Sequence, residues 1–254
     1  MVQDRRILNR TPSRGQDQDW THEHAESAFG ALAAPASHDW RSPAWPISDQ
    51  GDTGSCVGWA AAEGVMRPIL ARSNKIALSQ SMSPRFTWMA AKETDEFRSQ
   101  ATTFVEYEGT SIKAACRICT RFGALRESDL PFSGKLFRGE TDALYAIAAR
   151  FRAQSYFNLG RAPTESWRRW IFQHGPILIG LDVDQTWDDA SSDILDEFRP
   201  DTTRGGHAAS IVGYTPSTFI VRNSWGQDWG ELGFANVSDR YARAAFTEAY
   251  GIIV

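Results

Sequence analysis

The chain has 254 residues, of which 42% are hydrophobic and 12% aromatic, enough for one large domain or two modest lobes. Its 27 Lys and Arg face 31 Asp and Glu, a net charge of −4, which excludes a general binder of nucleic acid or anionic lipid. No apolar run approaches the roughly 18 residues of a membrane-spanning helix, and the first residues lack the apolar segment of a signal peptide. We therefore expect no nucleic-acid or membrane partner, and a cytoplasmic protein or an effector exported without a Sec signal peptide.

Residues 1–38 are polar, then rich in Ala, with scattered Pro and Gly and no sustained periodicity. This pattern predicts an N-terminal extension with little core of its own. Its apolar side chains, Ile7, Leu8, Trp20 and Phe29, indicate that it contacts the body of the protein. Two arrangements remain open: a short propeptide-like plug across a groove, or a permanent strap behind the body.

In the remainder, residues 39–254, the predicted secondary structure changes from helices to strands near residue 150. Helical spacing of apolar residues predicts helices at 56–66, 84–92, 111–122 and 141–149. Beyond about residue 150 the pattern predicts short strands at 176–181, 207–214 and 219–225, with one helix at 164–174. A helical half followed by a β half predicts an α+β protein with a groove between two lobes. The helical lobe spans about 50–150, and the β lobe about 151–254 plus 39–49.

Four residues together supply what acyl transfer by a thiol needs: a thiolate, a base, a group that orients the base and a donor to the oxyanion. Cys56 begins an expected helix, where unpaired N–H groups and the helix dipole lower a thiol pKa. His207, at the start of a strand, would form a thiolate–imidazolium pair with it. Asn223, at the end of the next strand, would orient the imidazole, and Gln50 would donate its side-chain amide to the oxyanion.

Three stretches of the sequence resemble the papain-like cysteine peptidases, in particular bacterial-type members. They are Asp39-Trp40-Arg41 with Gln50-Gly51-Asp52-Thr53-Gly54-Ser55-Cys56, then Gly206-His207-Ala208, then Asn223-Ser224-Trp225-Gly226-Gln227-Asp228-Trp229-Gly230. The resemblance implies the papain-like two-lobe fold, a helical lobe plus an antiparallel β-barrel-like lobe with the active-site groove between them. It also implies a monomeric cysteine endopeptidase that cleaves a peptide or protein substrate through a thioester acyl-enzyme, without metal or cofactor.

The match to the family is not complete. Thr53 stands where the family usually has a disulfide cysteine, which agrees with the low cysteine count and a reducing compartment. Val57 replaces the usual aromatic residue after the nucleophile, and Gly206 replaces a position that is often Asn or Asp. Any electrostatic tuning by a side chain at that last position is therefore missing.

The same resemblance implies a set of substrate-binding residues. Trp225 would cover the hydrogen bond between His207 and Asn223 and exclude water from it. Gly109 would pair through its backbone with an extended substrate. Gly180 and Ala208 would line the main specificity pocket, and because both are small we expect a roomy pocket for a bulky apolar side chain.

Other candidate sites carry weaker signals. Cys116 and Cys119 form a Cys-x-x-Cys pair in the middle of an expected helix, without the second pair of a zinc site, and are interpreted as small buried hydrophobes. His22-Glu23-His24 lacks a third ligand at matching spacing. The acidic segment 182–201 is expected to be a solvated loop, or alternatively a surface that steers basic peptides to the groove.

Two alternative functions use the same residues. The Cys56, His207 and Asn223 trio would also suit an acyl transferase or peptide ligase that passes the acyl group to an amine. The body could instead be a non-catalytic peptide-binding module, although the retained thiol, imidazole and amide together argue against it. Cys56 reactivity and product mass with an added amine separate the three.

Overall fold

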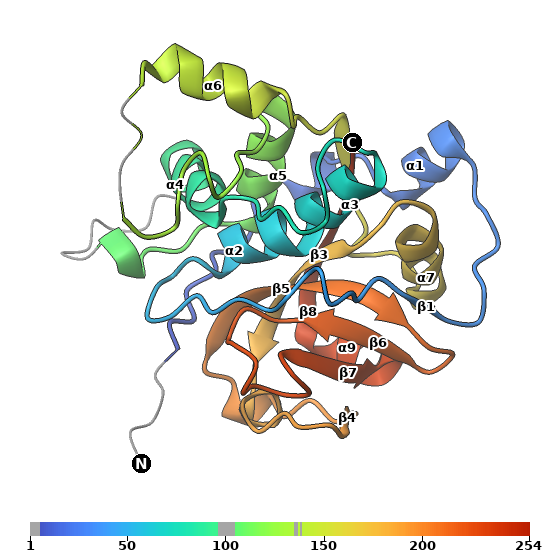
Figure 1. The fold of residues 1–254 in the computed structure, drawn as a ribbon. Helices are drawn as coiled ribbons and strands as arrows, with labels where there is room; N and C mark the ends of the chain where they lie inside the picture. Colours follow the sequence, from blue (N-terminus) through green and yellow to red (C-terminus); the bar gives the residue numbers. More distant parts are fainter. Residues whose placement is uncertain (1–5, 96–104, 135–136, 138) are drawn as a thin grey trace.

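The computed structural model describes residues 6–95, 105–134, 137 and 139–254. One group of helices lies against one face of an open, mostly antiparallel sheet, as Figure 1 shows, and other helices pack against the opposite face. The helices are α1 (His22–Phe29), α2 (Cys56–Trp59), the π-helical segment η2 (Ala60–Met66), α3 (Arg67–Arg72), α4 (Pro84–Thr94), α5 (Ile112–Arg121), α6 (Thr141–Ala149), α7 (Thr164–Gln173), α8 (Gln185–Asp188) and α9 (Asp239–Ala245). Short 3-10 turns occur at Gln16–Gln18, Val105–Tyr107 and Pro200–Thr202.

The central helical rod runs from Cys56 to Arg72 without a break, six residues beyond its predicted end. Its two glycines mark close approaches to other elements. A Cβ on Gly58 would lie 2.5 Å from the carbonyl oxygen of Pro84 in α4, and a Cβ on Gly64 would lie 2.3 Å from the Ser210 hydroxyl. These glycines therefore hold Cys56 close to both the helical layer and the sheet.

The sheet has the strand order β2-β8-β3-β5-β6-β7-β4, with β1 paired to β5. The strands are β1 (His38–Asp39), β2 (Ser155–Asn158), β3 (Ile177–Val183), β4 (Ile194–Leu195), β5 (Gly205–Tyr214), β6 (Thr218–Arg222), β7 (Phe234–Ser238) and β8 (Phe246–Ile253). All pairs are antiparallel except β4 with β7. The described strands do not close into a ring, so the β half is an open sheet and not the expected barrel-like lobe.

The N-terminal extension contacts the body along most of its described length. Residues 6–11 lie over the groove described below. The next turn is held by the buried Lys113, whose ammonium donates to the carbonyls of Arg14 and Gly15 and pairs with Asp19 at 2.7 Å. Helix α1, which the sequence analysis did not anticipate, packs beside β2 with Ala25 in the core. The extension is therefore a cover for the groove at its start and a strap at its end.

The weaker candidate sites acquire structural roles. Cys116 and Cys119 are fully buried on α5, and burial raises the pKa of both thiols, that of Cys119 to about 12. His24 accepts a hydrogen bond from the Thr21 N–H and so caps α1. Within the described residues no group of three potential metal ligands occurs. Nor does the described part of the chain contain a helix with the length and apolarity to cross a membrane.

Candidate active site

Cys56 is the first residue of α2 and is completely buried. The N–H of Ala208 on β5 faces its sulfur, and together with the N–H groups of Cys56 and Val57 it lowers the thiol pKa. Burial acts in the opposite direction and is the larger effect, so the pKa of Cys56 rises from 9.0 to about 11. The predicted helix-terminal position of the nucleophile is present, but in this arrangement the sulfur is a neutral thiol.

His207 and Asn223 meet across neighbouring strands. The Nε2 atom of His207 lies 2.8 Å from Oδ1 of Asn223, which also accepts the Ser224 N–H at 2.8 Å. Because an amide oxygen only accepts, Nε2 of His207 carries the proton and the neutral ring leaves a lone pair on Nδ1. Among the described residues that Nδ1 has no hydrogen-bond partner. The imidazole thus has a free nitrogen with which to take a proton.

Aromatic side chains enclose the imidazole. The Trp225 ring lies 4.8 Å from that of His207, at an interplanar angle of 43°, in the place predicted for it. Trp187 on α8 stands at 6.4 Å on another side. Desolvation lowers the pKa of His207 to about 4, although the hydrogen bond that the ring donates to Asn223 raises it. Sequence reasoning missed Trp187, because it lies in the segment interpreted as a solvated loop.

Gln50 joins the nucleophile segment to the asparagine segment. Its side-chain amide donates to the carbonyl of Thr53 at 2.9 Å, and its side-chain oxygen accepts from the Ser224 hydroxyl at 2.8 Å. Its backbone N–H also donates to the Ser224 carbonyl at 2.8 Å. The side chain is buried and fixed, and one N–H of its amide remains for a further acceptor. The role of Gln50 as an oxyanion donor stays a prediction.

The extension crosses the groove beside these residues. Arg10 N–H donates to the Gly206 carbonyl, and Thr11 N–H donates to the Thr110 carbonyl, both at 3.1 Å. A Cβ on Gly109 would lie only 1.9 Å from the carbonyl oxygen of Asn9. Backbone pairing near Gly109 was expected of a substrate. In this structure the N-terminal extension, and not a substrate, lies beside Gly109.

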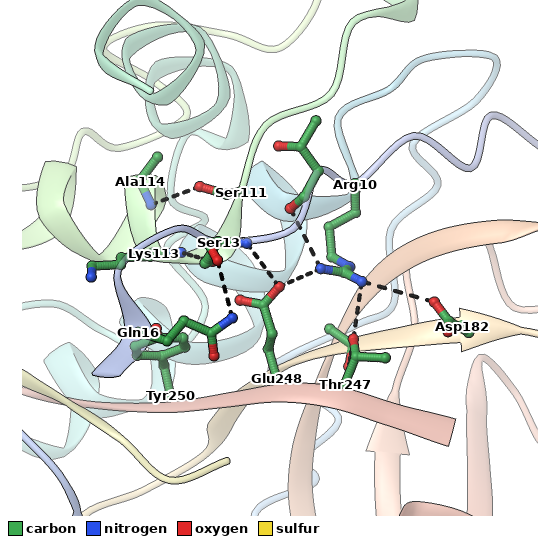
Figure 2. Close-up of polar contacts among 12 residues, drawn as sticks. Arg10, Ser13, Gln16, Ser111, Lys113, Ala114, Asp182, Thr247, Glu248 and Tyr250 are labelled. Atoms are coloured by element: carbon green, nitrogen blue, oxygen red, sulfur yellow. Dashed lines mark hydrogen bonds and ion pairs between the residues drawn. The ribbon is translucent and has the colours of Figure 1, made fainter. Parts of the chain in front are cut away.

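The residues behind the extension include Gly180 and Ala208, around which the resemblance predicts a specificity pocket. In the sheet register Gly180 lies directly opposite Ala208 on β5 and directly opposite Glu248 on β8. Opposite residues of a ladder share one face, so Glu248 forms the wall that sequence analysis did not identify. The guanidinium of Arg10 fills this pocket and pairs with Glu248 at 2.5 Å (Figure 2). The expectation of a pocket for an apolar side chain stays a prediction, and the side chain that lies against these residues in the covered protein is basic.

A second hollow lies at the other end of the groove. This cleft of about 670 Å³ is lined by Trp225, Trp229 and several charged residues. Arg6 of the extension lies in it and pairs with Asp49 at 2.6 Å. The extension therefore contacts Glu248 through Arg10 and this cleft through Arg6.

The acidic segment 182–201 is only partly solvated. Asp184 is completely buried, where it caps α8 and accepts hydrogen bonds from Arg199 N–H and the Tyr241 hydroxyl. Asp188 pairs with Arg204. The interpretation of the whole segment as a solvated loop is wrong at these positions, and the steering of basic peptides stays a prediction.

Comparison with known proteins assigns the chain to a family. The model of the papain family cysteine proteases matches residues 34–251. The chain therefore belongs to the papain family, and the expected family is confirmed. It is 22% identical to cathepsin K of Gallus gallus over 79% of this chain, and 26% identical to the gamete and mating-type specific protein A of Dictyostelium discoideum over 84%. The chain spans 58% and 45% of the lengths of these two relatives.

Solved structures give the same fold. The crystal structure of xylellain, a cysteine protease from Xylella fastidiosa, superimposes with a TM-score of 0.78 at 19% identity. The match covers 100% of this chain and 99% of that one. The papain-like α+β fold is therefore confirmed.

Proposed function

We propose that the chain is a cysteine endopeptidase that hydrolyses peptide bonds through Cys56, His207 and Asn223. The observation that carries the proposal is the hydrogen bond of 2.8 Å between His207 and Asn223, with the other imidazole nitrogen unpartnered and Ala208 N–H facing the Cys56 sulfur. Membership in the papain family supports the same conclusion. The acyl group is transferred first to sulfur and then to water.

In the first step the Cys56 proton passes to Nδ1 of His207, and the thiolate attacks the peptide carbonyl carbon. The oxyanion is held by the Cys56 N–H and the side-chain amide of Gln50. Collapse of this intermediate breaks the C–N bond, and His207 returns its proton to the leaving amine. In the second step His207 takes a proton from water, the hydroxide attacks the thioester, and the proton returns to the departing Cys56 sulfur.

The covered structure is a resting form of this enzyme. Burial raises the Cys56 pKa and lowers the His207 pKa, away from the thiolate–imidazolium pair, and it outweighs the charge of Arg10, which lowers the Cys56 pKa. We propose that residues 8–11, which contact Gly109 and Gly206 beside the site, supply part of this burial. Release of the segment returns water to the groove, so that the Cys56 pKa falls and the His207 pKa rises. We therefore expect catalytic competence only after this segment has moved.

The test compares the full-length protein with an Arg10→Glu variant, which places a carboxylate against Glu248 and so expels the segment. Iodoacetamide at pH 7 should alkylate Cys56 at least about tenfold faster in the variant, because water that enters the groove favours the thiolate. Peptide hydrolysis should rise in parallel and vanish in Arg10→Glu/Cys56→Ala. A released, folded protein that cleaves no peptide contradicts the proposal. Products that contain an added amine in place of water would instead indicate a transferase.

A further inference from the structure

A cleft of about 300 Å³ lies between the N-terminal extension and the edge of the sheet. The extension lines it with Gln18, Asp19 and Trp20, and the chain that enters β2 lines it with Gln154, Ser155 and Tyr156. In the strand order β8 and β3 separate β2 from β5, which carries His207, so this cleft is distinct from the catalytic groove. We infer that it binds an uncharged pyranose sugar, alone or at the end of a glycan. The inference goes beyond the proposed peptidase function and does not depend on it.

Trp20 provides the cleft with an apolar wall. It is 61% exposed, yet it is held in place, because its carbonyl accepts the Asn158 N–H at 2.7 Å and its ring lies 6.0 Å from that of Phe157. An indole fixed in this way offers a flat, rigid surface that loses little conformational entropy when a ligand binds. The C–H groups on one face of a pyranose ring pack against such a surface, and the cleft has the volume of a small-molecule site.

Polar side chains around the indole can pair with the hydroxyls of a sugar. Gln18 and Gln154 are both exposed at the cleft. A carboxamide donates through its nitrogen and accepts through its oxygen, which matches a hydroxyl that does both. The Ser155 hydroxyl is enclosed and has no hydrogen-bond partner among the described residues. Because an enclosed hydroxyl without a partner is unfavourable, a ligand hydroxyl that bonds to it stabilises the site.

The charged groups at the cleft are already paired. Asp19, the one charged side chain among the described lining residues, forms an ion pair with Lys113 at 2.7 Å and accepts the Tyr250 hydroxyl at 2.8 Å. Arg117 hydrogen-bonds the Tyr156 side chain. A phosphate or carboxylate in the cleft would therefore face a carboxylate, and it would leave water without gaining a counter-ion. An uncharged sugar avoids this penalty.

The experiment uses full-length Cys56→Ala, in which the readout is independent of peptide hydrolysis. Nitrogen-15 NMR follows the backbone amides of Ser155 and Tyr156 while methyl β-glucoside, methyl β-galactoside, methyl α-mannoside or methyl N-acetyl-β-glucosaminide is added. At least one of these glycosides should shift both amides saturably, with a Kd on the order of 1 mM. Trp20→Ala should raise that Kd at least about tenfold, and Gln154→Leu, which keeps the bulk but not the amide, about threefold.

Phe29→Ala is the matched control. Phe29 is a second exposed aromatic residue of the extension, and its ring also lies against Phe157, at 6.1 Å, but it does not line the cleft. The control should leave the Kd unchanged. Equal weakening by Trp20→Ala and Phe29→Ala would overturn the inference, as would the absence of shifts with all four glycosides at about 50 mM, well above the expected Kd. A proline-rich peptide that shifts these amides when no glycoside does, or glucose 6-phosphate that binds more tightly than the methyl glucoside, would also overturn it.

Discussion

Asn223 holds the ring of His207 from the neighbouring strand, with the Asn223 oxygen 2.8 Å from Nε2 and Trp225 lying over the imidazole. The contact fixes the proton on Nε2 and directs Nδ1 away from β6. It also raises the pKa of His207, against the larger opposite effect of burial. In the released enzyme this raising effect favours the imidazolium that the thiolate needs as its partner.

Replacement of Asn223 by Ala should therefore impair catalysis and move its pH dependence. In the Arg10→Glu background we expect kcat/KM to fall at least about tenfold. Loss of the hydrogen bond lowers the His207 pKa, so the alkaline limb of the pH profile should move to lower pH. The matched control is Asn236→Ala, since Asn236 is partly buried on β7 and its side-chain amide donates to the exposed Glu231. An unchanged alkaline limb would show that Asn223 does not tune the base.

The Gly109→Ala variant separates the alkylation rate of Cys56 from the turnover of a peptide substrate. A Cβ at this position cannot coexist with the Asn9 carbonyl oxygen 1.9 Å away, so Gly109→Ala should displace the covering segment. We expect faster alkylation of Cys56 by iodoacetamide than in the wild type. Peptide kcat/KM should nevertheless stay below that of Arg10→Glu, because a substrate backbone would meet the same Cβ. Gly160→Ala is the control, because the added Cβ would meet the side-chain oxygen of Asn158 at 3.2 Å and not the covering segment. An alkylation rate equal to the wild-type rate would place the segment elsewhere in solution.

The two parts of the extension should respond differently to truncation. Removing residues 1–12 takes away the cover and should raise peptide turnover while the melting temperature changes little. Removing residues 1–38 also takes away α1 and its buried Ala25, so thermal unfolding should begin at a lower temperature. Equal melting temperatures for the two truncated proteins would contradict the division of the extension into cover and strap.

The cover should hold most tightly near neutral pH. Covered His207 has a pKa of about 4, below its ordinary 6.5, so the uncovered state binds a proton more readily and acid opens the cover between those two values. Covered Cys56 has a pKa of about 11, above its ordinary 9.0, so alkali opens it between 9 and 11. Arg10 and Arg6 face the site and oppose protonation of His207 in the covered state.

Hydrogen exchange of the Arg10 and Thr11 amides measures this opening directly. After correction for intrinsic rates, protection should fall on the order of tenfold between pH 7 and pH 5. His207→Gln should abolish the acid-side loss. His174→Gln should preserve it, because burial also lowers the pKa of His174 to about 4 but this ring packs on Trp170, away from the groove. Constant protection of these two amides between pH 7 and pH 5 would show that protonation of His207 does not open the cover.

Local sequence signals predicted the elements on which the candidate catalytic residues lie. Cys56 follows a Gly-rich turn and opens an Ala-rich helix, and His207 and Asn223 lie on consecutive strand patterns that pair as hairpin neighbours. The predicted helices at 141–149 and 164–174 match α6 and α7 to within a residue. In each case the sequence pattern that predicts the helix or strand lies within the residues that form it.

The pocket could not be predicted in the same way. Glu248 becomes a neighbour of Gly180 only through the pairing of β3 with β8, which depends on register and on a bulge after Gly180. Arg10 is one basic residue in a polar extension, and nothing nearby in the sequence marks its partner 238 positions away. Long-range pairing of this kind is decided by tertiary packing.

The central claim is that the Cys56 sulfur carries the acyl group during turnover. Arg10→Glu protein mixed with a peptide p-nitrophenyl ester and quenched in acid within milliseconds should show, by mass spectrometry, an acyl group in place of the thiol hydrogen of Cys56. The adduct should disappear at the rate of turnover. Continued hydrolysis by Arg10→Glu/Cys56→Ala, or an adduct on another residue, would contradict the claim.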